Sequence, residues 1–502
     1  MNHGYEKHFS NIVYLVTISF FIFIIFLPAV YVLTFAIGGN FLLSDQLINA
    51  LYVSFFVSLS VTVINLIFGT SFAWIFVKMD KKYKNWFDNL IDLPLMIPTA
   101  ALGLSVYLFW GEFWSVGKGI SMIILLHVIF TLPYMVRSVS ASLEQINTTY
   151  NEAASTLGAS ILTIFRTIDL PLFKDGVVVG SVLTFTRSLS ETGATMMVAS
   201  ALTMTAPVYV VNLKKEGNIP EAAAASIILI LSALAILAAA KYITRQKHFN
   251  FSTFYPRFEY SLTDLWKARN IMSALFLVLF IIIPTFYIIL YNFVNFRPVF
   301  NMIMLEAFIV SFGLAAIVTA VGLIFAIPMA YFIARTRNEK ISAFFENLHD
   351  IVLLVPTSAL GFSLGLFWNK LNLSEYLVLI LSHLSFTFPL LVKPLAASIK
   401  NIEYGIEESA MTLGANHKQI LTTILFPLIM PAAIAGSIMA FTRSISETGA
   451  TLAVSKNIKT IPVLIVDLVD QNKMFEAGFI CLLLFIMSFI FLLLLKRTRS
   501  DN

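Results

Sequence analysis

NEAASTLGASILTIFRTIDLPL, residues 151–172, and EESAMTLGANHKQILTTILFPL, residues 407–428, are the two related segments that decide the fold of this chain. Each contains an acidic residue, a glycine six positions later and a proline thirteen positions after that glycine. The residues before the glycine favour a helix, and the glycine can adopt the positive φ that ends a helix. The proline ends a second helix. We therefore predict that each segment forms two short helices joined by a turn.

The composition of the whole chain is that of a membrane protein. Hydrophobic residues make up 58% and charged residues 12% of its 502 residues, and the mean hydropathy is +0.86. A soluble protein of this length needs far more polar surface. The net charge of only +5, with the basic residues between apolar runs, argues against a nucleic-acid-binding protein. The single cysteine, Cys481, excludes internal disulfides and a multi-thiolate metal site.

Apolar runs long enough to cross the hydrocarbon core of a bilayer, which takes roughly 20 residues, recur along the chain. We predict an all-α membrane protein with about twelve transmembrane helices, six in each half. The predicted spans cover residues 12–37, 51–77, 89–110, 120–142, 174–200, 222–243, 271–294, 306–334, 346–368, 375–397, 428–450 and 477–495. The first run is too long for the core of a signal peptide, so we expect it to be retained. Proline interrupts the runs that contain Pro94, Pro98 and Pro356.

The two halves of the chain are an internal repeat. LPLMIPTAALGLSVYLFW (93–110) matches VLLVPTSALGFSLGLFW (352–368), and LLHVIFTLPYMVR (125–137) matches LSHLSFTFPLLVK (381–393). An even number of spans gives both copies the same orientation, so we expect a parallel repeat with a pseudo-twofold axis along the membrane normal. The predicted parts are a first half, residues 1–243, a linker, residues 244–270, and a second half, residues 271–502.

The distribution of lysine and arginine predicts that both termini and the linker are cytoplasmic. In this orientation, 23 of the 33 basic residues lie in cytoplasmic segments or at their edges, eight lie outside, and Arg187 and Arg443 lie within spans. Segments 151–172 and 407–428 then lie on the cytoplasmic side, because they are too polar to cross the bilayer. A compact helical projection with an exposed acidic residue is typical of a docking site for a cytoplasmic partner.

The spacing in the first segment is Glu-Ala-Ala, three residues, Gly, nine residues, Ile, one residue, Leu-Pro. It resembles the signature loop of the permeases of ATP-binding-cassette (ABC) importers with the type I fold. The first segment matches this pattern at every position, and the second departs from it only at Ser409 and Phe426. The residues that the resemblance assigns to docking are Glu152, Ala153, Ala154, Gly158, Glu408, Ser409, Ala410 and Gly414.

The resemblance implies the permease subunit of an ATP-driven importer in the cell membrane, with both permease halves fused in one chain. It also implies two copies of a cytoplasmic ATP-binding subunit, one for each segment, and a substrate-binding protein outside the cell. The chain contains no G-x-x-x-x-G-K-[ST] motif, so we expect no ATP hydrolysis by the chain itself, no enzymatic activity and no cofactor. An ion-coupled secondary transporter with parallel repeats is the alternative. Such a transporter would not need these segments and would require further carboxylates within the membrane.

A second repeated stretch places charge inside apolar runs. FTRSLSETGATMMVA (185–199) and FTRSISETGATLAVS (441–455) are identical at eleven of fifteen positions. An arginine inside a membrane span costs several kcal/mol unless it is paired or hydrated. A glutamate four residues later lies on the same face of the helix. The pair either braces its helix or lines a pathway or gate, where glycine allows helices to approach closely across the pseudo-axis. The pathway candidates are Arg187, Glu191, Gly193, Arg443, Glu447 and Gly449.

The same stretch is similar to the corresponding part of molybdate, tungstate and sulfate permeases, with SETGAT in place of a Gly-Glu-aromatic-Gly-Ala-Thr run. The fused layout instead resembles ferric-iron and thiamine permeases. The resemblance therefore implies a small oxyanion as substrate, or else iron(III) or thiamine. His127 and His383 occupy equivalent positions in the fourth and tenth predicted spans. We expect each to form a hydrogen bond with a neighbouring helix, and we predict no metal site.

Overall fold

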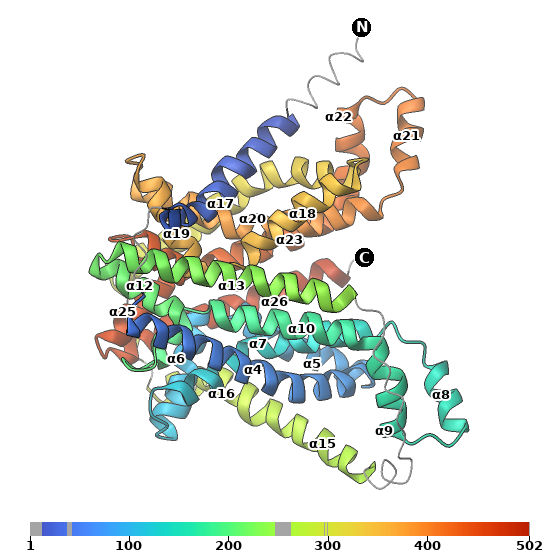
Figure 1. The fold of residues 1–502 in the computed structure, drawn as a ribbon, viewed down its shortest axis with the longest axis horizontal. Coiled ribbons are helices and arrows are strands. Elements are labelled where there is room, and N and C mark those ends of the chain that lie inside the picture. Colours follow the sequence, from blue (N-terminus) through green and yellow to red (C-terminus); the bar gives the residue numbers. More distant parts are fainter. Residues whose placement is uncertain (1–12, 38–42, 246–262, 296, 299, 501–502) are drawn as a thin grey trace.

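The computed structural model describes residues 13–37, 43–245, 263–295, 297–298 and 300–500. Within these ranges all regular secondary structure is helical (Figure 1). Both termini and most of the predicted linker, residues 246–262, lie outside the described residues. The cytoplasmic linker therefore stays a prediction.

The helical elements of the two halves follow the repeat seen in the sequence. Those of the first half are η1 (Phe21–Phe26), α2 (Leu27–Val30), η2 (Tyr31–Leu33), α3 (Thr34–Ile37), α4 (Asp45–Val77), α5 (Lys81–Met96), α6 (Thr99–Val106), η3 (Tyr107–Phe113), α7 (Ile120–Leu143), α8 (Thr149–Thr156), α9 (Ile161–Ile164), η4 (Phe165–Asp169), α10 (Leu170–Ser190), α11 (Gly193–Val198), α12 (Ala206–Glu216) and α13 (Ile219–Arg245). Those of the second half are α15 (Thr263–Phe276), η5 (Leu277–Ile282), α16 (Ile283–Val294), α17 (Met302–Arg335), α18 (Glu339–Leu354), α19 (Thr357–Asn369), α20 (Glu375–Asn401), α21 (Tyr404–Thr412), α22 (His417–Gln419), η6 (Ile420–Leu425), α23 (Phe426–Ser446), α24 (Gly449–Val454), α25 (Ile461–Asp470) and α26 (Met474–Ser500). Segments labelled η are tighter or wider turns that continue a neighbouring helix.

Eight of the described helices are long and apolar enough to cross a membrane. They are Val13–Leu33, Asp45–Val77, Ile120–Leu143, Ile219–Ala239, Ala268–Val294, Met302–Arg335, Glu375–Asn401 and Ile420–Ser446. The pair α18 and α19, which meet at 103°, makes a ninth if counted as one span. The bend follows Val355, whose ψ of 132° is the extended conformation favoured before a proline. The all-α membrane fold is confirmed, and eight or nine of the twelve predicted spans meet these criteria.

A break divides the predicted span 89–110. It falls at Ile97 and Pro98, at the position that corresponds to the bend between α18 and α19. Pro94, by contrast, lies inside α5 and does not end it. The predicted span 477–495 lies within one continuous helix, α26. Proline thus interrupts the helices at Pro98 and at Pro356, in corresponding positions of the two halves.

The predicted spans 174–200 and 428–450 do not continue as single helices. Two residues, beginning with Glu191 and with Glu447, separate α10 from α11 and α23 from α24. Both glutamates have an extended backbone, with ψ of 134° and 127°. The expectation of one continuous helix through each Arg–Glu pair is therefore wrong. The serine, threonine and glycine around each glutamate form helices poorly, and the glutamate side chain begins the next helix, as described below.

Each half places its first span against the opposite half (Figure 1). Ser363 of α19 donates a hydrogen bond to the carbonyl oxygen of Pro28 (2.8 Å) and accepts one from the N–H of Val32 (2.9 Å). Ser105 of α6 makes the same two bonds with α16, at 2.7 and 3.0 Å. Each serine hydroxyl takes the place of an intrahelical i, i+4 hydrogen bond, which locally opens the helix that it enters. The halves are therefore interlocked by an exchange of spans.

The two related segments 151–172 and 407–428 lie at one end of the molecule (Figure 1). We call residues 151–172 loop 1, residues 407–428 loop 2, and this end the loop end. The short helices α12 and α25 lie at the opposite end. The first span begins near the loop end, because Tyr14 stacks on Tyr331 close to the end of α17, with ring centroids 6.5 Å apart.

Candidate functional site

Each loop turns at its predicted glycine. α8 ends before Gly158, whose φ is +83°, and α21 ends before Gly414, whose φ is +90°. In loop 1 the N–H of Ala159 closes the turn on the carbonyl oxygen of Ala154 at 3.0 Å, and the corresponding residues of loop 2 do the same. Glycine adopts this left-handed conformation without steric cost. The predicted turn between two helical segments is confirmed in both loops.

The proline of each loop does not end the second helix, contrary to the expectation. Helix α9 continues through the wide turn η4 into α10, with Pro171 in the first turn of α10, and Pro427 has the same place in α23. A wide π-type turn directly before each proline accommodates its missing N–H inside the longer helical stretch. The second part of each loop is therefore a direct extension of the next long helix.

Both loops expose the same small set of side chains. Glu152 and Glu408, the acidic residues of the motif, are exposed. Leu157 and Leu413, each directly before the turning glycine, are both 88% exposed. A leucine this exposed, outside the long apolar helices, has no packing partner in the described part of the chain. Each loop thus presents an apolar tip next to a carboxylate.

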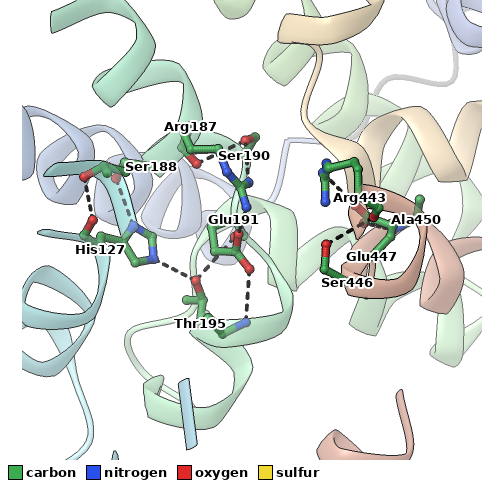
Figure 2. Close-up of polar contacts among 12 residues, drawn as sticks. His127, Arg187, Ser188, Ser190, Glu191, Thr195, Arg443, Ser446, Glu447 and Ala450 are labelled. Carbon is green, nitrogen blue, oxygen red and sulfur yellow. Dashed lines mark hydrogen bonds and ion pairs between the residues drawn. The ribbon is translucent and has the colours of Figure 1, made fainter. Parts of the chain in front are cut away.

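The two Arg–Glu units lie side by side, next to the contact between the two halves (Figure 2). Arg187 Nη2 lies 2.7 Å from Glu191 Oε2, and Arg443 Nη2 lies 2.7 Å from Glu447 Oε2. The glutamate side chains are 3% and 2% exposed, whereas the arginine side chains are 18% and 25% exposed. Each unit therefore buries its carboxylate and leaves part of its guanidinium accessible.

The second carboxylate oxygen of each unit begins the following helix. Glu191 Oε1 accepts a hydrogen bond from the N–H of Ala194 at 3.1 Å, and Glu447 Oε1 accepts one from Ala450 at 2.8 Å. A carboxylate at a helix N-terminus satisfies a free N–H group and is favoured by the helix dipole. The glutamate therefore joins the two helices on either side of the break, with the arginine on one helix and the free amide on the other.

The two buried histidines connect the same helices by a second route. His127 contacts Ser188 Oγ through Nδ1 and Thr195 Oγ1 through Nε2, both at 2.8 Å (Figure 2). His383 makes the equivalent contacts at 2.9 and 3.1 Å. The prediction that these histidines form hydrogen bonds with a neighbouring helix is confirmed. Each bridges α10 to α11, or α23 to α24, across the break.

The glycines of the repeated stretch lie at the contact between the two halves. A Cβ on Gly193 would lie 2.4 Å from Thr448 Oγ1, and a Cβ on Gly449 would lie 2.6 Å from Thr192 Oγ1. No side chain fits at such distances without a shift of the neighbouring residue. The close approach expected across the pseudo-axis is therefore present at both glycines, and it is reciprocal.

A lysine that the sequence analysis did not single out joins the halves at the end opposite the loops. Lys214 of α12 donates hydrogen bonds to the carbonyl oxygens of Leu452 (3.2 Å) and Ser455 (2.9 Å), at the end of α24. Burial lowers the pKa of Lys214 to about 8. Lys215 follows it directly, and nothing in the sequence distinguishes the two. Only the fold identifies Lys214 as a contact between halves.

No group of three or more His, Cys, Asp or Glu side chains that could hold a metal ion occurs among the described residues. Cys481 is buried in α26, within the apolar core.

Permeases described as transporting sulfate, molybdate or tungstate are similar in sequence to this chain. The sulfate transport system permease protein CysT of Salmonella typhimurium is 30% identical over 214 residues, which cover 39% of this chain and 75% of the relative. The molybdate/tungstate permease WtpB of Methanocaldococcus jannaschii is 28% identical over 242 residues, which cover 47% of this chain and 96% of the relative. The molybdenum permease ModB of Escherichia coli is 32% identical over 212 residues, covering 39% and 92%.

The family model for the inner membrane component of binding-protein-dependent transport systems matches twice, at residues 65–249 and 322–500. The relatives are ABC permease subunits, in which ATP hydrolysis occurs in a separate subunit, so the chain is not an enzyme. The family also disfavours the ion-coupled secondary transporter. This chain therefore belongs to the inner membrane components of binding-protein-dependent transport systems, as an ABC importer permease that carries two permease halves in one multi-pass membrane protein.

Proposed function

We propose that this chain forms the membrane pathway of an importer for a small oxyanion, and that loops 1 and 2 dock two copies of a cytoplasmic ATP-binding subunit. A substrate-binding protein would deliver the oxyanion at the opposite end. In this orientation the loop end and both termini are cytoplasmic, in agreement with the excess of basic residues there. The start of the first span near the loop end, at Tyr14, supports the same orientation.

The observation that carries the docking proposal is the identical tip of the two loops. Residues 156–158 and 412–414 are both Thr-Leu-Gly, with the leucine 88% exposed and the glycine at positive φ. Burial of an exposed leucine side chain against a partner contributes about 1.5–3 kcal/mol, so each tip offers binding energy that the free chain leaves unused. Two equal tips suit two equal clefts, and therefore two copies of one ATP-binding subunit.

The central Arg–Glu units support an oxyanion as substrate. Each carboxylate is occupied by its arginine and by a helix N-terminus, whereas each guanidinium keeps an accessible part. The accessible charge at the contact between halves is therefore positive, which lowers the electrostatic barrier for an anion in a narrow passage. The relatives described as sulfate, molybdate and tungstate permeases agree with this substrate class.

The docking proposal can be tested with the permease purified together with its ATP-binding subunit. Leu157→Asp/Leu413→Asp and Glu152→Lys/Glu408→Lys should each abolish co-purification of the subunit and substrate-stimulated ATP hydrolysis. Leu202, which is 83% exposed at the opposite end, offers a matched control, and Leu202→Asp should leave both measurements unchanged. Normal ATP hydrolysis in either double variant would contradict docking at the loops.

The substrate is best identified by uptake into cells that lack the native permease and express this chain with its partners. Molybdate, tungstate and sulfate are measured in parallel with iron(III) and thiamine. We expect uptake of at least one oxyanion and none of the two cationic substrates. Uptake of iron(III) or thiamine alone would contradict the oxyanion proposal and leave the docking proposal intact.

A further inference from the structure

Two adjacent glutamates of loop 2 have opposite environments. Glu408, the acidic residue of the motif, is exposed, whereas Glu407 is 0% exposed. Both belong to α21, but Glu407 points back toward the membrane helices. A carboxylate is this deeply buried only when charged or hydrogen-bonded partners surround it. Its partners therefore determine how loop 2 is held.

The partners of Glu407 belong to the end of α17. Both Nε and Nη2 of Arg335, the last residue of α17, reach Glu407 Oε1, at 2.8 and 2.6 Å. The hydroxyl of Tyr331 donates to Glu407 Oε2 at 2.9 Å. Arg335 Nη2 also donates to the carbonyl oxygen of Ile402, directly before α21, at 3.0 Å. Tyr14 of the first span stacks on Tyr331 and completes this cluster.

This cluster is charge-assisted and sheltered from water, so it resists deformation more than a surface ion pair does. The Arg335 side chain is only 13% exposed. The two residues that it holds, Ile402 before loop 2 and Glu407 within it, flank the start of α21. In the described part of the chain, the polar contacts between α21 and α17 all pass through Arg335 and Tyr331. The first turn of α21 in loop 2 is therefore fastened to α17, a helix that spans the membrane.

Loop 1 is attached differently. Asn151 occupies the position that corresponds to Glu407, and Lys78 and Trp74 occupy those of Arg335 and Tyr331. The Asn151 side chain forms a hydrogen bond with Asp169, which follows within the same loop. Lys78, at the end of α4, lies over the Trp74 ring at 3.9 Å and attracts the carboxylate of Asp169, so the cation of this half acts on the later part of loop 1 and not on α8. The two loops thus share their tips but not their attachment to the long helices.

We propose that the Arg335–Glu407 pair is the rigid link through which movement of loop 2 reaches α17, so that loop 2 transmits force more directly than loop 1. This inference rests on the proposed docking of loop 2 to an ATP-binding subunit. Arg335 and Glu407 are positioning residues, because they contact neither the partner nor the substrate. Without the pair, the subunit would still bind the tip of loop 2, but its closure would move the loop without moving the helix.

The test uses the complete transporter reconstituted in vesicles, with uptake of the substrate and ATP hydrolysis measured together. Glu407→Gln keeps the shape and removes the charge, and Asn151→Ala is the matched control in loop 1. We expect Glu407→Gln to raise the ATP hydrolysed per substrate transported about tenfold, while affinity for the ATP-binding subunit changes less than about twofold. Asn151→Ala should leave the ratio unchanged. The exchange Arg335→Glu/Glu407→Arg should restore part of the coupling.

An unchanged ratio in Glu407→Gln would overturn the proposal. If that variant is produced in low yield, the ratio is measured on the folded complex that remains, and in Arg335→Lys, which keeps the charge but loses the two-nitrogen contact. A normal ratio in both would show a structural brace and would also overturn the proposal. Failure of the unaltered chain to bind the ATP-binding subunit is a separate result, which would refute docking itself.

Discussion

The two Arg–Glu units can be compared contact by contact, and so can the two loops. In both units the arginine Nη2 lies 2.7 Å from the glutamate, and the glutamate accepts a bond from the amide three residues on. The loops share their turn and their exposed leucine. They differ where they meet the membrane helices, with the buried Glu407 in loop 2 and Asn151 in loop 1.

The two central units are alike and the two loop attachments differ, because these regions make different contacts. The central units meet each other, because Gly193 lies against Thr448 and Gly449 lies against Thr192. A change in one unit alters the surroundings of the other, so the two copies are constrained together. Each loop base contacts helices of its own half together with the exchanged span of the other half, through Tyr14 near loop 2 and through Arg269 at Phe165 of loop 1. The attachment of the loops was therefore free to diverge, whereas the centre was not.

The largest expected effect tests whether the central units are equivalent. Arg187→Gln leaves Glu191 buried and without its cation, which should cost about 3–5 kcal/mol of stability. Arg443→Gln should have the same effect through Glu447. The apparent melting temperature and yield in detergent measure stability, and uptake is scored separately.

The double change Arg187→Gln/Glu191→Gln separates a brace from a pathway role. We expect it to restore most of the yield, because no unpaired charge remains, while uptake of the oxyanion stays low. Recovery of uptake together with yield would show that the pair only braces the helices. Unequal effects of the single changes in the two halves would contradict their equivalence.

A smaller effect is expected at the contact between the units. Gly193→Ala places a Cβ 2.4 Å from Thr448 Oγ1 and 2.5 Å from its Cβ, so the backbone must move. Overpacking of this kind should cost about 1–3 kcal/mol. Thr448→Gly should rescue Gly193→Ala in thermal unfolding, whereas Thr448→Ala should not, because its Cβ remains.

Gly313 supplies the control for this prediction. It lies within α17, where a Cβ would point into open space, so Gly313→Ala should be neutral or slightly stabilising. Gly449→Ala, with distances of 2.6 and 2.8 Å to Thr192, should be somewhat milder than Gly193→Ala. Equal stability of Gly193→Ala and Gly313→Ala would show that the halves do not meet as described.

The smallest expected effect concerns the contact that joins the halves at the end opposite the loops. The pKa of Lys214 is about 8 in the folded chain and 10.5 ordinarily. Between these values the unfolded chain binds more protons, so this group makes the protein more stable as pH rises through the window. The melting temperature of the unaltered chain, relative to Lys214→Met, should rise by less than about 3 °C from pH 7 to pH 10, since the side chain is partly solvated. A fall in this difference would contradict burial of Lys214 between the halves.

The sequence by itself determined the features that depend on neighbouring residues. The length of the apolar runs predicted a helical membrane protein, the repeat predicted two equivalent halves, and the glycines at 158 and 414 predicted the turns. These signals are local, because the cost of exposing a polar backbone to lipid and the cost of positive φ both arise within one segment. The family pattern in loop 1 is of the same kind.

Only the tertiary structure decided how distant residues satisfy one another. Glu191 reads as part of a continuous span, yet its carboxylate ends one helix and begins the next, because Arg187 and the N–H of Ala194 both bind it. Glu407 and Glu408 are the same residue type in adjacent positions, and the sequence offers no reason to bury one of them. Glu407 is buried because Arg335, 72 residues earlier, ends its helix beside it. A buried charge requires a partner, and the fold alone brings that partner within reach.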